Sequence, residues 1–160
     1  MPNIYKPEFD DVSERPGFAH GRAFVGRRAG AQRLGMSLWE IPAGDAAYPY
    51  HYHLVEEEMM IVLSGLPRLR TPSGWRDLEE GEVVSFLPGV EGGHQLMNRT
   101  DESVRILVVS TAGAPEIAIY PDSNKVGVRQ RDVSAGAEGL RMNFEMSSAV
   151  DYWQGEHPPT

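Results

Sequence analysis

Apolar and polar residues alternate in short runs between residues 34 and 110. In 34–41, Leu34, Met36 and Leu38 alternate with Gly35, Ser37 and Trp39, which predicts a half-buried strand that ends at Pro42. Further apolar runs predict strands at 58–63, 66–71, 75–78, 82–87 and 104–110. Glycine, proline and acidic residues mark the short turns between them, and no helical period intervenes. This regular spacing predicts an all-β barrel or sandwich.

The two flanks of this central region read differently. Residues 1–33 are interrupted by Pro and Gly, and their best strand candidate is 23–25, in an extension that packs on the barrel or on a partner subunit. Residues 34–120 form the predicted barrel, which closes with a strand at 116–120. Residues 121–160 form an arm, predicted to pack on the barrel or on a second subunit. The aromatic pair Tyr152 and Trp153 favours order in this arm, because disordered tails are poor in aromatics.

Composition excludes several kinds of protein. A chain of 160 residues is long enough for one domain with a real core. The absence of cysteine excludes disulfides and thiolate metal sites. A net charge of −8 argues against nucleic acid as the main partner. No apolar run is long enough for a membrane span, and no signal peptide is evident at the N-terminus, so a cytoplasmic location is expected.

Candidate chemistry is concentrated in residues 44–65. His51 and His53 are two residues apart, so a strand would direct both imidazoles to one face. Glu58 follows, and His94 supplies a third imidazole from a distant strand that barrel closure can bring near. Imidazole and carboxylate together suit a borderline divalent metal such as Mn, Fe, Zn or Ni. Glu56 is either a partner of a ligand histidine or an exposed turn carboxylate.

Two stretches of this sequence follow a recognisable pair of motifs. The first runs from Gly44 through His51, His53 and Glu58 to Gly65, and the second from Gly81 through Pro88 and His94 to Asn98. Their order and spacing resemble the two motifs of the cupin superfamily. The gap before His51 is one residue longer than usual, and the glycines between Pro88 and His94 are shifted. Neither departure changes a ligand position.

The resemblance implies a double-stranded β-helix, a jelly-roll barrel with metal near its mouth and, commonly, a homodimer. It implies His51, His53, Glu58 and His94 as metal ligands. The flanks, including residues 150–156, also look like those of small single-domain bacterial cupins, most of which have no assigned activity.

Two functions fit such a site. The first is a metal-dependent enzyme, oxygenase-like or isomerase-like, that acts on a small organic molecule. The second is a non-catalytic module that binds a sugar or a carboxylate, and a purely structural zinc is a third, weaker alternative. Tyr50, Gln95 and Arg68 are candidates to contact a small ligand at the barrel mouth. Met60 is a further candidate because it shares the face of Glu58, although core packing is its simpler interpretation.

Overall fold

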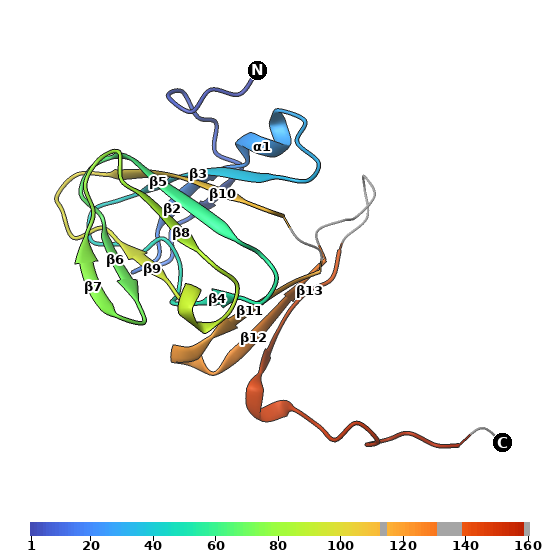
Figure 1. Ribbon diagram of the computed structural model, residues 1–160. Coiled ribbons are helices and arrows are strands. Elements are labelled where there is room, and N and C mark those ends of the chain that lie inside the picture. Colours follow the sequence, from blue (N-terminus) through green and yellow to red (C-terminus); the bar gives the residue numbers. More distant parts are fainter. Residues whose placement is uncertain (113–114, 131–138, 159–160) are drawn as a thin grey trace.

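The computed structural model describes residues 1–112, 115–130 and 139–158, and its architecture is almost entirely β (Figure 1). The strands are β1 (Asp11–Ser13), β2 (His20–Ala23), β3 (Gly35–Ile41), β4 (Tyr52–His53), β5 (Glu58–Ser64), β6 (Arg68–Thr71), β7 (Gly74–Asp77), β8 (Val83–Phe86), β9 (Gln95–Met97), β10 (Val104–Ser110), β11 (Glu116–Tyr120), β12 (Lys125–Arg129) and β13 (Arg141–Glu145). The helical segments are α1 (Val25–Arg28) and the 3₁₀ turns η1 (Val90–Gly92), η2 (Pro121–Ser123) and η3 (Met146–Ser148). Within the described ranges, no helix is both long and apolar enough to cross a membrane.

The strands form three antiparallel sheets. A six-stranded sheet has the order β1-β2-β3-β10-β5-β8, a four-stranded sheet β13-β12-β11-β4, and a three-stranded sheet β7-β6-β9. Some neighbours are consecutive strands, as β6 and β7 are, but others are distant in sequence, as β3 and β10 are, so the chain also crosses between sheets. This arrangement confirms the predicted all-β jelly-roll barrel.

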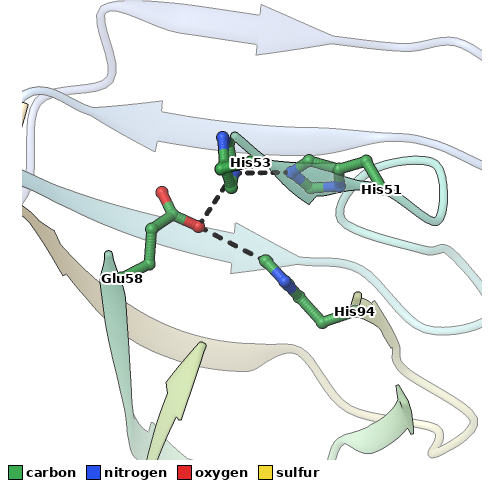
Figure 2. A group of neighbouring side chains, drawn as sticks. All are labelled: His51, His53, Glu58 and His94. Atoms are coloured by element: carbon green, nitrogen blue, oxygen red, sulfur yellow. Dashed lines mark hydrogen bonds and ion pairs between the residues drawn. The ribbon is translucent and has the colours of Figure 1, made fainter. Parts of the chain in front are cut away.

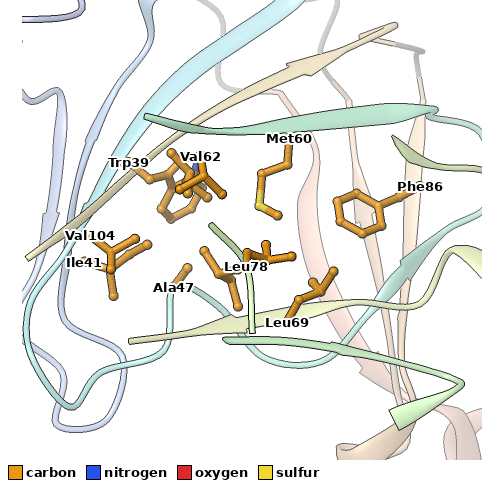
Figure 3. Packing of buried hydrophobic residues seen from close by; sticks show 11 residues of the cluster. Trp39, Ile41, Ala47, Met60, Val62, Leu69, Leu78, Phe86 and Val104 are labelled. Atoms are coloured by element: carbon orange, nitrogen blue, oxygen red, sulfur yellow. The ribbon is translucent and has the colours of Figure 1, made fainter. Parts of the chain in front are cut away.

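The main core fills the space between the sheets (Figure 3). Strand β5 contributes Met60 and Val62, which are 0% and 1% exposed, and β3 contributes Trp39 and Ile41. Leu69 of β6 packs against them from the opposite side. Because residues two apart on a strand share a face, Met60 and Val62 line the interior together. On β3 the interior face carries Trp39 and Ile41, so the predicted apolar series that includes Met36 and Leu38 lies on the other face.

The outer face of the six-stranded sheet is covered as well. Leu38 of β3 and Leu107 of β10 pack there with Ala23 and Val25 from the N-terminal extension. Strand β3 is therefore buried on both faces. The prediction that it is only half-buried is wrong. The cause is tertiary, since the covering residues lie outside the strand's own sequence pattern.

The strand predicted at 23–25 is displaced. Strand β2 ends at Ala23, and the chain turns into α1 at Val25. The carboxylate of Asp10 accepts a hydrogen bond from the Phe24 amide at 2.7 Å, so this amide is bound by a side chain and not by a neighbouring strand. This hydrogen bond to a residue 14 positions earlier takes the place of a strand ladder bond at Phe24.

The C-terminal residues continue the four-stranded sheet and then leave it. Strands β12 and β13 extend the sheet beyond β11, and the residues after η3 run away from the barrel (Figure 1). Tyr152 and Trp153 pack against one another with ring centroids 4.8 Å apart, but they are 82% and 71% exposed.

Candidate metal centre

Four side chains from three separate segments converge near one end of the barrel (Figure 2). Their ligand atoms all lie within 4.8 Å of one another, and the residues are His51, His53, Glu58 and His94. The Nε2 atoms of His51 and His53 are 3.1 Å apart. Oε2 of Glu58 lies 3.2 Å from Nε2 of His53 and 3.4 Å from Nε2 of His94. The structure thus brings together the four residues that the motifs indicate.

Backbone pairing places these side chains. The amides and carbonyls of His51 and His94 are reciprocally hydrogen-bonded at 3.1 and 2.8 Å, which aligns the two segments. His53 lies on β4 and pairs with Ala118 of β11, while Glu58 is the first residue of β5. Alternation along 51–53 then directs both imidazoles to the inner side.

Each ring is oriented by a hydrogen bond at its other nitrogen. Nδ1 of His51 lies 2.9 Å from the Pro49 carbonyl, and Nδ1 of His94 lies 2.9 Å from the Gly92 carbonyl. Because a carbonyl oxygen only accepts, both Nδ1 atoms carry the proton. In the neutral rings, the bare lone pairs are therefore on Nε2 and face the common centre, where they require a proton or a metal ion between them.

The surroundings of the cluster shift the pKa values of His51 and His53 in opposite directions. Burial, reinforced by the neighbouring rings of His94 and His53, lowers the pKa of His51 to about 3. Burial also disfavours the charged form of His53, but hydrogen bonds from its ring to Glu116 and Glu58 outweigh this and raise its pKa to about 9. Burial opposes ionisation of Glu58, yet a hydrogen bond from protonated His53, together with the adjacent His94 ring, holds its pKa well below the usual value. Without a metal, the centre thus holds a proton on His53.

Glu116 was not predicted from the sequence as a site residue. It is the first residue of β11, fully buried, and its Oε1 lies 2.5 Å from Nδ1 of His53. Glu56 is fully buried nearby, and its carboxylate belongs to a second group with His53 and Glu116. The expectation that Glu56 could be an exposed turn residue is therefore wrong. A usable signal was the period-two pattern of 116–120, which places Glu116, Ala118 and Tyr120 on one face.

The four predicted ligand-contacting residues occupy different surroundings. Met60 is fully buried in the core, and Gln95 donates its side-chain amide to the Tyr48 carbonyl at 3.2 Å. The Tyr50 ring lies under the Arg70 guanidinium, 4.2 Å from it. Arg68 pairs with Asp77 at 3.0 Å and lines a separate cavity of about 550 Å³. None of these contacts joins the four residues to a ligand, so their role stays a prediction.

Aromatic rings surround the metal-ligand cluster. Phe86 stacks on His94 with centroids 3.8 Å apart, and Tyr48 meets the edges of His51 and His94. Tyr120 lies nearly parallel to His51, at 5.7 Å and 23°. Rings at these positions shield the cluster from water on several sides.

A basic side chain adjoins this aromatic shell. Nη2 of Arg129 donates a hydrogen bond of 3.1 Å to the hydroxyl of Tyr120. Lys125 places its ammonium 5.6 Å from the same ring. Both cations are half-buried on the face of β12 that also carries Gly127.

Comparison with known families identifies the barrel. The sequence model of the cupin domain matches residues 37–110, which include all four converging side chains. Residues 37–110 are thus recognised as a cupin domain. No curated protein matches this chain at the sequence level.

Several solved structures share the architecture over most of the chain. A sugar phosphate isomerase from Silicibacter pomeroyi, described as a cupin, is similar with a TM-score of 0.78 and 23% identity, over 93% of this chain and 94% of that one. The polyketide cyclase RemF from Streptomyces resistomycificus gives a TM-score of 0.57 and 20% identity, over 84% and 87%. A Cupin 2 conserved barrel domain protein from Salinispora arenicola gives 0.52 and 22%, over 68% and 89%. At these identities the likeness concerns the fold.

Proposed function

We propose that His51, His53, Glu58 and His94 bind one divalent metal ion and that this cupin is a metal-dependent enzyme acting on a small organic molecule. The observation that carries the proposal is the convergence of three Nε2 atoms and one carboxylate oxygen on one point. Such a donor set fits Mn, Fe, Zn or Ni, and thiolate-preferring ions are disfavoured because the chain has no cysteine. When bound, the ion would supply Lewis acidity to a substrate oxygen.

The chain's own residues would orient the substrate and limit water. Phe86 and Tyr48 pack on the ligand histidines, so one side of the centre is apolar. Tyr120 lies along His51 on another side, with its hydroxyl held by Arg129. If a substrate oxygen binds at the centre, the remainder of the substrate would lie beside Tyr120 and Arg129.

We further propose that the substrate carries an anionic group that binds Arg129. Arg129 lies directly opposite Arg141 in the β12–β13 register, where like charges destabilise a sheet. In the part of the chain that the structure describes, no carboxylate lies within ion-pair distance of Arg129 or Lys125. Glu116 lies opposite Arg129 on β11 without forming an ion pair, so a carboxylate or phosphate could supply a directly bound countercharge. Arg offers the paired donors that suit either group.

Metal content tests the first proposal. His51→Ala should lose stoichiometric metal, because it removes one of four donors, whereas His157→Ala changes an exposed residue and should retain it. The measurement is elemental analysis of both purified variants beside the wild type. Equal metal content in the two variants would show that the ligand set is wrong.

Ligand stabilisation tests the anionic group. Millimolar malonate or inorganic phosphate should raise the melting temperature of the metal-loaded protein, because ligands that bind only the folded state stabilise it. Arg129→Met should abolish this rise and keep its metal, while Arg15→Met, an exposed control, should retain both. A rise that persists in Arg129→Met would refute the anionic site without affecting the metal proposal.

The alternative function is a non-catalytic ligand-binding module. The same metal and the same Arg129 contact would serve a sensor of small carboxylates or sugars. Product formation from a bound ligand distinguishes the two, since a sensor would show saturable binding of an unchanged molecule.

A further inference from the structure

Strand β13 ends the four-stranded sheet with an open edge. The sheet order is β13-β12-β11-β4, and all five residues of β13 are exposed. An edge strand presents unpaired backbone N–H and C=O groups that can pair with another strand. Natural proteins usually protect such an edge, and nothing in the described part of the chain pairs with the free side of β13.

The outer face beside this edge is apolar. Register pairing places Ile117, Val128 and Met142 in one row across β11, β12 and β13. The next row on the same face is formed by Ile119, Val126 and Phe144. Met142 and Phe144, at the edge, are 43% and 41% exposed. Since one face of an antiparallel sheet is normally polar where it meets water, this face indicates a covering partner.

The sequence of β13 is complementary to itself when reversed. It reads Arg141, Met142, Asn143, Phe144, Glu145. If two copies pair antiparallel about Asn143, Arg141 of one lies opposite Glu145 of the other, and Met142 lies opposite Phe144. Opposite charges and apolar residues are then paired at every position except the axis.

We propose that β13 pairs with β13 of a second copy of this chain about a two-fold axis at Asn143, which joins two four-stranded sheets into one of eight strands. A two-fold interface uses the same patch on both subunits, so the reversed complementarity of β13 meets its requirement. The two apolar rows become continuous across the junction. The proposal does not depend on the metal or on the substrate.

Charges inside one subunit support this pairing. Arg141 lies opposite Arg129 within its own sheet, and among the described residues it forms no ion pair with a carboxylate. Glu145 of the second copy would place a negative charge beside Arg141. The exposed residues 149–158 follow β13 after the single turn η3, so in the pair they would lie close to the second copy.

Charge reversal tests the pairing on the full chain. The wild type should behave as a dimer with twice the chain mass of 17.7 kDa in light scattering coupled to gel filtration. Arg141→Glu alone and Glu145→Arg alone each place like charges opposite one another at two symmetric positions, so each should weaken dimerisation on the order of tenfold or more. The double variant R141E/E145R restores opposite charges and should recover the dimer.

Two controls make the result decisive. Glu80→Arg changes the net charge as much as Glu145→Arg does, but at an exposed turn outside β13, and should leave the dimer intact. Circular dichroism melting of each variant checks that the fold is retained. A monomeric wild type, or single variants that dimerise as well as the wild type, would overturn the proposal, as would a double variant that stays monomeric.

Discussion

At the scale of single residues, the three imidazoles differ in what orients them. His51 and His94 are held by backbone carbonyls, whereas His53 is held by a carboxylate, Glu116. A carboxylate partner raises the basicity of a ligand ring and fixes its tautomer. Among the three histidines, the contribution of His53 to metal binding therefore depends on a second side chain.

Glu116→Gln should weaken metal binding about 10- to 100-fold, because outer partners of ligand histidines typically contribute that much. Competition with a chromophoric chelator measures the dissociation constant directly, independent of any activity. The control is Glu57→Gln, the same change next to the ligand Glu58 but at an exposed position. Unchanged affinity in Glu116→Gln would mean that the 2.5 Å contact only supports packing.

The pH profile of binding gives a second readout for this variant. The pKa of His53 is raised from 6.5 to about 9, so below pH 9 a proton competes with the metal, and affinity should rise with pH up to that value. In the metal-free protein, this proton stabilises the fold fully below pH 6.5, and the contribution is lost as pH rises through about 9. Without the Glu116 carboxylate, both changes should move to lower pH.

At the scale of elements, β5 connects the core and the metal-ligand cluster. Glu58 begins the strand at the centre, and Met60 and Val62 follow on the same face into the core. Met59 points to the other side and is 44% exposed. One strand thus carries a ligand and two core residues on one face.

Met60→Ala should lower the free energy of unfolding by about 2–5 kcal/mol, since it leaves a cavity in a fully buried site. Met59→Ala makes the same chemical change on the exposed face and should cost about 0.5 kcal/mol or less. Urea denaturation of both metal-free variants provides the comparison. Similar losses would place Met60 outside the packed core.

The loop before His94 explains the shifted glycines of the second motif. A Cβ on Gly92 would lie 1.8 Å from the Leu87 carbonyl oxygen, and one on Gly93 would lie 2.4 Å from the Tyr50 hydroxyl. Gly89 adopts a φ of 98° just before η1. The glycines therefore lie where the backbone turns or where other atoms approach it closely. His94 still reaches the metal-ligand cluster although the glycine spacing before it differs from the usual motif.

At the scale of the whole molecule, the barrel connects residues that are distant in sequence. His53 and Glu116 are 63 residues apart, yet they meet because β4 and β11 are neighbours in one sheet. The C-terminal strands build on the same sheet, so the proposed two-fold junction lies on the sheet that carries His53 and Glu116. The N-terminal extension packs on a different sheet, where it covers the outer face of the six-stranded sheet.

The sequence alone determined the barrel and its four converging side chains. Strands 104–110 and 116–120 were predicted at their observed bounds, because apolar alternation and flanking turns are local signals. His51, His53, Glu58 and His94 could be predicted because their spacing is part of the motifs. Asn98, the last residue of the second motif, bonds the following turn through its side chain, which donates to the Glu102 carbonyl and accepts from the Thr100 amide.

Tertiary structure alone decided the rest. Glu116 could not be assigned to His53 from spacing, because strand order in a sheet is set by how the whole chain packs. The burial of both faces of β3 depends on Ala23 and Val25, which belong to another segment. The open edge of β13 likewise follows from its place at the end of a sheet. Local patterns specify which side of a strand is apolar, but only packing between distant segments specifies what lies against it.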